Sequence, residues 1–158
     1  MVPRRVSQIL VQIEEPVVLS WARRNGWRVT IDVDRLQIAA EVIHPNDETT
    51  LSLNADLNGY RAIPPAWRFV DGNGIVTKSA FPAAGSVVGG KSSIFHPNLI
   101  ICAPFNRLAF KEADGPHADW GESTGWFDVT GDFAKAYSIA EMLSIIYVHL
   151  RFSPGRMQ

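Results

Sequence analysis

Apolar and polar positions in the first 25 residues follow a helical period. Residues 4–13 carry apolar side chains three or four positions apart, as on one helical stripe: Val6, Ile9, Leu10 and Ile13. Pro16 is expected to end or kink this segment. Residues 17–24 suit one or two further helical turns stopped by Asn25-Gly26, although the apolar run at 17–19 also suits a strand.

The next thirty residues change to a period of two, which is typical of half-buried strands. Strands are predicted at 27–36, 37–43 and 49–57, and His44-Pro45-Asn46-Asp47 has the composition of a turn between the last two. Strands that follow one another so closely form an antiparallel meander. The side chains expected to face inward are Trp27, Val29, Ile31, Val33, Leu51, Leu53, Ala55 and Leu57.

Beyond the third strand, the chain leaves the sheet at Asn58-Gly59-Tyr60 and returns to it once. Pro64 and Pro65 lack N–H donors, so the fourth strand is expected only after them, at Trp67–Val70. Residues 71–74 form a turn and residues 75–93 a loop. Gly89-Gly90-Lys91-Ser92 is not a phosphate-binding loop, because the full glycine spacing and a preceding strand are missing.

The clearest predicted helix begins after Ser138, which forms a capping box with Glu141, and Pro154-Gly155 stops it. Its apolar stripe is expected to lie on a sheet face: Ile139, Met142, Leu143, Ile146 and Leu150, widened by Ile145 and Val148. The sequence therefore predicts one α+β domain over residues 1–158. It comprises an N-terminal helix, a four-stranded antiparallel meander sheet, a long loop region that carries the candidate active-site residues described below, and a C-terminal helix packed on the sheet.

Composition excludes several classes of protein. The 158 residues are 46% hydrophobic and 20% charged, enough apolar material for a folded core. A net charge of −1 without any basic run argues against binding nucleic acid by phosphate neutralisation. A single cysteine cannot form an internal disulfide. Without a signal-peptide pattern or an apolar run of membrane-spanning length, we expect a cytoplasmic protein that does not bind membranes.

The candidate chemistry centres on Cys102, in a proline-stiffened stretch that also holds His96 and Asn98. A lone cysteine is most often a small buried hydrophobe, yet beside polar side chains it is also a candidate nucleophile. His117 and Asp119 lie in a loop-rich segment at 113–125, where they are either functional or part of a solvated turn.

Several segments, taken in order, resemble the ubiquitin-conjugating (E2) family. Tyr60 to Phe69 is similar to the family's Tyr-Pro…Pro-Pro-x-x-x-Phe segment, and His96-Pro97-Asn98 followed by Ile101-Cys102 is similar to its His-Pro-Asn motif and active-site cysteine. Trp120 or Trp126, followed by the helix after Ser138, resembles its Trp-x-Pro and next helix. The resemblance covers residues 27–152 and is to a divergent bacterial member.

The sequence departs from the family pattern in three places. Cys102 lies four residues after Asn98, roughly half the family's distance. The segment between Cys102 and the last helix is longer than usual and lacks a clean Trp-x-Pro, and no further helices follow in this sequence.

The resemblance implies that Cys102 accepts the C-terminus of a ubiquitin-like protein from an E1-like adenylating enzyme as a thioester and passes it to a target lysine. It assigns Asn98 to support of the active-site loop and the oxyanion, and His96 to structural hydrogen bonds. If the short spacing keeps Asn98 away, His117 as base or orienter and Asp119 as a group that helps deprotonate the amine take its place. No cofactor or metal is expected.

Two other readings stay open. The chain is a catalytically inactive E2-like module that binds a ubiquitin-like protein or a partner enzyme, because fold does not fix function. Alternatively, Cys102, His117 and Asp119 form a hydrolase constellation, or with His96 a zinc site, although the close ligand spacing of known motifs is missing.

Overall fold

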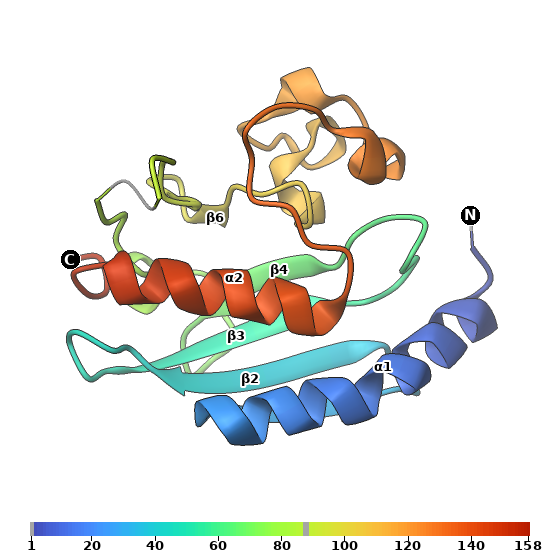
Figure 1. Ribbon diagram of the computed structural model, residues 1–158, viewed down its shortest axis with the longest axis horizontal. Coiled ribbons are helices and arrows are strands. Elements are labelled where there is room, and N and C mark those ends of the chain that lie inside the picture. The colour runs from blue at the N-terminus through green and yellow to red at the C-terminus, as the bar shows by residue number, and fades with distance from the viewer. Residues whose placement is uncertain (1, 87–88) are drawn as a thin grey trace.

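The computed structural model describes residues 2–86 and 89–158, so residues 87 and 88 of the predicted loop lie outside the described residues. Two helices and a four-stranded sheet follow the predicted order (Figure 1). The main elements are α1 (Arg4–Asn25), β1 (Arg28–Asp32), β2 (Gln37–Ile43), β3 (Thr50–Asp56), β4 (Ala66–Val70), β5 (Phe95–His96), β6 (Ile100–Ile101) and α2 (Ile139–Phe152). Short 3-10 helices occur at Lys78–Ala80, Arg107–Ala109, Lys111–Ala113, Ala118–Trp120 and Ser123–Asp128.

Helix α1 is continuous through Pro16, so of the two outcomes expected at this proline, an end or a kink, the end is wrong. Pro16 removes one N–H donor, but the helix continues because Val18, Trp21 and Ala22 beyond it are buried in the core. Gly26 stops the helix as predicted, with a left-handed φ of 75°. The N-terminal stripe is largely exposed; Val6, Ile9 and Ile13 are 42%, 42% and 68% exposed, while Leu10 is half-buried.

The sheet is an antiparallel meander in the order β1-β2-β3-β4, as predicted. Strand β2 has the predicted bounds, and Leu51, Leu53 and Ala55 of β3 are buried as expected. Strand β1 is shorter than predicted because residues 33–36 form the turn into β2. The antiparallel order of the predicted fold is therefore confirmed, with errors confined to strand ends.

Helix α2 crosses one face of the sheet (Figure 1). Its predicted stripe is fully buried at Ile139, Met142, Leu143, Ile146 and Leu150. Val148 is 40% exposed and does not widen this face, because it lies on the side of the helix away from the sheet. Ser138 caps the helix by accepting a hydrogen bond from the Glu141 N–H. Within the described chain, neither helix combines the length and apolarity required to span a membrane.

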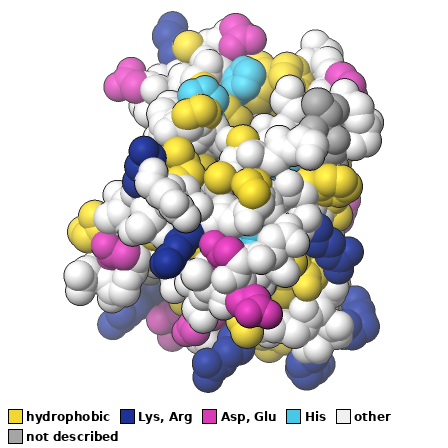
Figure 2. All heavy atoms as spheres, turned by 90° about the vertical axis from the view of Figure 1, so that its left-hand side faces the viewer, with side chains coloured by type: hydrophobic (Ala, Val, Ile, Leu, Met, Phe, Trp, Pro, Cys, Tyr) yellow, Lys and Arg dark blue, Asp and Glu magenta, His cyan; other side chains and the backbone are white. Residues whose placement is uncertain are grey.

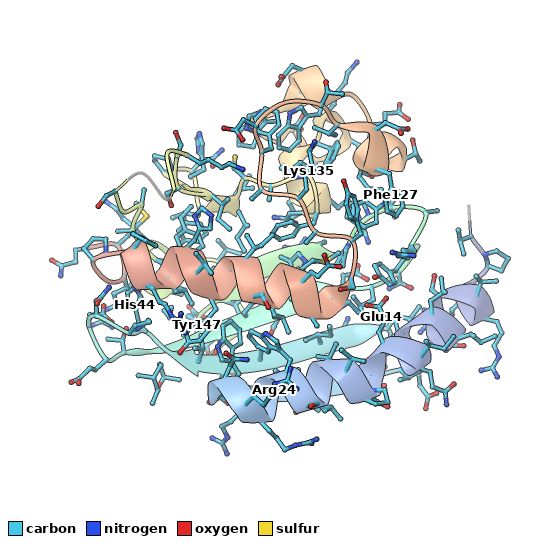
Figure 3. All side chains as sticks on the ribbon, viewed as in Figure 1. Glu14, Arg24, His44, Phe127, Lys135 and Tyr147 are labelled. Carbon is cyan, nitrogen blue, oxygen red and sulfur yellow. The ribbon has the colours of Figure 1, made fainter. Side chains whose placement is uncertain are left out.

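Glu14 of α1 ties the two helices to the loop that precedes β4. Its carboxylate accepts hydrogen bonds from the Tyr60 hydroxyl at 2.6 Å and from the Ile139 N–H at 2.8 Å. Figure 3 shows Glu14 beside the end of α2 that begins at Ile139. A carboxylate there also complements the positive end of the helix dipole. The start of α2 is therefore fixed by a residue more than 120 positions earlier.

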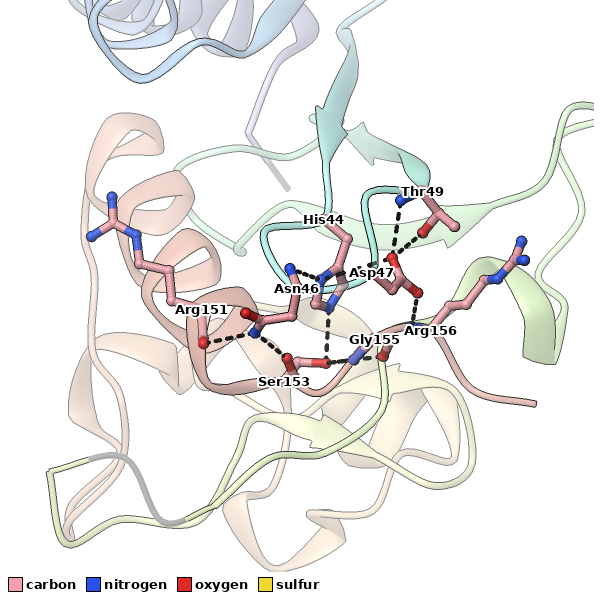
Figure 4. Close-up of polar contacts among 8 residues, drawn as sticks. All are labelled: His44, Asn46, Asp47, Thr49, Arg151, Ser153, Gly155 and Arg156. Atoms are coloured by element: carbon pink, nitrogen blue, oxygen red, sulfur yellow. Dashed lines mark hydrogen bonds and ion pairs between the residues drawn. The ribbon is translucent and has the colours of Figure 1, made fainter.

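The turn at His44 holds the C-terminal segment (Figure 4). His44 is fully buried; its Nδ1 accepts the Asn46 N–H at 3.1 Å, so the neutral ring donates from Nε2 to Ser153 Oγ at 3.0 Å. The Asn46 amide donates to the carbonyls of Arg151 and Ser153. Partial burial alone would raise the pKa of Asp47, but hydrogen bonds from Thr49 and the Arg156 N–H lower this pKa to about 2.

Asn106 joins the sheet to the segment that carries Cys102. Asn106 is fully buried, and its Oδ1 accepts the Trp67 N–H at 2.9 Å while its Nδ2 donates to the Ile101 carbonyl at 2.9 Å. The neighbouring Arg107 donates from its side chain to the carbonyl oxygens of Asn58 and Pro64. These bonds fix β6, and so the residue after it, against the outer edge of β4.

Replacing the Asn106 side chain tests this connection. We expect Asn106→Ala to lower the free energy of unfolding by about 2–3 kcal/mol, because the buried Trp67 N–H and Ile101 carbonyl lose their partner. Asn98→Ala is the matched control: its side chain is exposed, so the expected change is within about 0.5 kcal/mol. Urea unfolding measures both, and equal losses for the two variants would contradict the role of Asn106.

Candidate functional site

A two-stranded hairpin presents the candidate nucleophile. Strands β5 and β6 pair antiparallel, and the turn between them is closed by Leu99 N–H to the His96 carbonyl at 2.9 Å. The Asn98 N–H donates to His96 Nδ1 at 3.1 Å, the same side-chain contact that Asn46 makes with His44. Leu99 has a left-handed φ of 69° and belongs to the turn, so β6 begins only at Ile100.

Cys102 directly follows β6 and is held by its backbone. Its N–H donates to the Ile94 carbonyl at 2.6 Å, and the Ile94 N–H donates to His149 Nδ1 at 3.2 Å. Two hydrogen bonds, one between main-chain groups and one to the His149 ring, thus connect the hairpin to the last turn of α2.

One pocket of about 340 Å³ collects the thiol and three histidines. Its lining includes Cys102 and His96 from the hairpin region, His117 just before the 3-10 helix Ala118–Trp120, and His149 of α2. Figure 2 shows histidine side chains near the top of one face of the molecule, next to hydrophobic ones. The structure therefore brings the three sequence-predicted residues Cys102, His96 and His117 to one place.

The thiol of Cys102 is half-buried, and burial raises its pKa to about 11. At pH 7 only about one molecule in ten thousand then carries the thiolate. A nucleophilic role for Cys102 accordingly requires a neighbouring group that removes its proton during the reaction.

His149 was not predicted as part of the site. Burial, followed by the charge of Lys91, lowers its pKa, and the Ile94 N–H occupies Nδ1, so the ring is neutral at pH 7 with its proton on Nε2. Lys91 itself pairs with Asp132 at 3.0 Å on the rim of the pocket. The helical period would have placed His149 on the buried side, three residues after Ile146.

His117 differs from the other two histidines in its environment. Its ring stacks on Trp120 with centroids 3.9 Å apart, and its Nδ1 lies 3.5 Å from Asp119 Oδ1. That separation is longer than a hydrogen bond, yet it favours the tautomer with the proton on Nδ1. Nε2 is then left as an acceptor. His96 and His149 instead use Nδ1 as the acceptor and keep the proton on Nε2.

The remaining predicted site residues do not line the thiol pocket. Asn98 is exposed and does not line the pocket, and Asp119 lines a neighbouring one. Within residues 2–86 and 89–158, no group of three or more histidine, cysteine or acidic side chains is arranged to hold a metal ion. The zinc reading therefore has no support in this geometry.

Comparisons with family models, with curated proteins and with solved structures found no match to this chain.

The reactivity of Cys102 should follow its raised pKa. We expect the rate of alkylation by iodoacetamide to rise about tenfold per pH unit from pH 7 towards about 11, because only the thiolate reacts. Intact-mass spectrometry at each pH measures the rate, and the urea-unfolded chain, which should plateau near pH 9, is the control. A plateau below pH 9 in the folded protein would show instead an activated thiolate.

The buried histidines should make stability depend on pH. Burial lowers the pKa of both His44 and His149 below 6.5, so below that pH the unfolded chain binds more protons than the folded one. The contribution of these two histidines to the free energy of unfolding is therefore complete above pH 6.5. It falls as the pH is lowered, by at most about 1.4 kcal/mol per pH unit for each histidine.

Urea unfolding between pH 7.5 and 5 measures this dependence. His44→Gln and His149→Gln should each reduce the slope, since each removes one of the two buried imidazoles. A free energy of unfolding that stays constant or rises as the pH falls would contradict the assignment.

Proposed function

We propose that the protein is an E2-like carrier that holds a ubiquitin-like protein as a thioester on Cys102 and transfers it to an amine. The observation that carries this proposal is the pocket in which Cys102 lies beside three histidines. The α1–sheet–α2 order is compatible with the fold that the motifs resemble. The partners are an E1-like adenylating enzyme, the ubiquitin-like protein and a target lysine.

Two acyl transfers would pass through Cys102. In the first, the sulfur of Cys102 bonds to the acyl carbon of the E1-like enzyme's thioester, and the bond to the enzyme's sulfur breaks. The proton of the Cys102 thiol ends on that departing sulfur. In the second, the neutral amine of the target forms the new C–N bond, the C–S bond breaks, and one amine proton ends on Cys102.

His117 is the base that suits this chemistry best. A thiol with a pKa of about 11 needs an acceptor for its proton, and His117 is the pocket histidine whose Nε2 is left as an acceptor. Asp119, 3.5 Å from the Nδ1 of this ring, orients it. His96 and His149 offer Nε2–H donors instead, which suit the oxygen of a tetrahedral intermediate.

The alternative is a catalytically inactive module that binds a ubiquitin-like protein or a partner enzyme. Two observations favour it. The thiol is un-ionised at neutral pH, and Asn98, to which the family resemblance gives the oxyanion role, is exposed outside the pocket. Such a module would keep its partner when Cys102 is replaced.

A charging assay tests the proposal. The protein is mixed with ATP, an E1-like adenylating enzyme and a ubiquitin-like protein, and products are separated on non-reducing gels. We expect a conjugate that dithiothreitol removes and that Cys102→Ala does not form. No conjugate from an active adenylating enzyme, together with pull-down of the partner by Cys102→Ala, would replace the carrier proposal by the binding module.

A second measurement tests the base. His117→Gln should slow both charging and discharge onto free lysine, by about 100-fold where proton removal limits the rate. Asp119→Asn should slow them less, because it leaves the imidazole in place. Asp114→Asn is the control: Asp114 is exposed, lies outside the pocket and has a left-handed φ that asparagine tolerates. Unchanged rates in His117→Gln would remove His117 from the mechanism.

A further inference from the structure

A second pocket, of about 600 Å³, adjoins the thiol pocket. Its lining residues include two acidic ones, Asp119 and Asp128, and two aromatic ones, Trp120 and Phe133. Phe133 lines both pockets and so forms a common wall between them. The lining of the second pocket includes no lysine, arginine or histidine. It therefore has acidic and aromatic walls and no positive charge of its own.

The surrounding segment has a strong charge asymmetry. Residues 111–135 contain six acidic and two basic residues, whereas the whole chain has a net charge of only −1. Asp132 in this segment already pairs with Lys91. For the carboxylate of Asp128, no ion pair or hydrogen bond is found with any other residue of the described chain. A cation entering the pocket would thus meet an unpaired negative charge.

The aromatic walls are held in position by their neighbours. Trp120 is stacked on His117, and Phe133 meets Trp120 edge-to-face with centroids 4.9 Å apart. Ordered aromatic rings beside carboxylates attract cations through the ring quadrupole as well as through charge. They also accommodate the methylene stem of a lysine or arginine side chain. A carboxylate ligand would be repelled, and a neutral apolar one would leave the acidic groups unused.

We propose that this pocket binds a lysine or arginine side chain of the polypeptide that is presented to Cys102. The role as an acceptor subsite rests on the proposed carrier function, whereas the binding of a basic side chain does not. The shared wall at Phe133 sets that side chain next to the thiol pocket. The pocket would then favour acceptor segments that carry a basic residue near the modified amine.

Peptide titration tests the binding. Three capped pentapeptides, identical except for a central lysine, arginine or norleucine, are added to ¹⁵N-labelled protein. The indole N–H resonance of Trp120, assigned with Trp120→Phe, reports occupancy. We expect the two basic peptides to shift this resonance, more weakly as salt is raised, and the norleucine peptide to leave it unchanged. An equal shift by norleucine, or no shift by either basic peptide, overturns the proposal.

Variants of the pocket sharpen the test. Asp128→Asn should weaken binding of the basic peptides about threefold, and Glu122→Gln, an exposed acidic residue of the same segment that does not line the pocket, should leave it unchanged. Gly125→Leu should block the pocket, because Gly125 is one of its lining residues. The fold should tolerate this leucine, since a Cβ at Gly125 meets no atom within 4 Å and the φ of −94° suits any residue. Gly72→Leu, equally unhindered but in the turn after β4, is its control.

The outcome is separable from that of the charging assay. Cys102→Ser should still bind the basic peptides, since the thiol does not line this pocket. Peptide binding without charging would support the pocket assignment and remove the carrier function. Charging without peptide binding would support the carrier function and remove the pocket assignment. Unchanged affinity in both Asp128→Asn and Gly125→Leu would overturn the assignment.

Discussion

The open edge of β4 is closed by a side-chain amide in place of a neighbouring strand, and the position of the candidate site depends on this contact. The Oδ1 of Asn106 accepts the Trp67 N–H, and its Nδ2 reaches the Ile101 carbonyl on β6. A side-chain amide has a donor and an acceptor, as a peptide group does. It therefore satisfies the Trp67 N–H and the Ile101 carbonyl although no β-ladder joins these strands. The hairpin that carries Cys102 is thereby fixed to the sheet although it shares no ladder with it.

The repeated tripeptide His-Pro-Asn illustrates how one local structure serves two purposes. At 44–46 and 96–98, the histidine Nδ1 accepts the N–H of the asparagine two residues later. In the first copy the ring is fully buried and its Nε2 holds Ser153, so the turn fixes the C-terminal segment. In the second copy the ring lines the thiol pocket. The tertiary surroundings of each copy, rather than the tripeptide itself, therefore decide which contact the histidine Nε2 makes.

Periodicity predicted the elements whose burial is regular. The bounds of β2, the inward face of β3 and the buried stripe of α2 could be derived because each alternates or repeats along its whole length. The stripe at the start of α1 misleads for a physical reason. Helical spacing shows that apolar side chains share a face, but it does not show whether another element covers that face, and Ile13 is 68% exposed. Glu14 beside it does contact the rest of the fold.

The candidate site was only partly predictable. Cys102, His96 and His117 stood out as chemistry-bearing residues near turns, and all three line one pocket. Asn106 and His149 could not be identified as partners of this region, because their hydrogen bonds join segments 39 and 55 positions apart. Long-range polar contacts of this kind leave no periodic signal in the sequence.

The central claim is that Cys102 carries an acyl group through its sulfur. The most direct measurement is the intact mass of the protein after incubation with the adenylating enzyme, the ubiquitin-like protein and ATP, followed by peptide mapping. A thioester gives the summed mass of the two proteins less one water, maps to Cys102 and is cleaved by neutral hydroxylamine. An adduct that survives hydroxylamine and maps to a lysine, or one that persists in Cys102→Ala, would contradict the account.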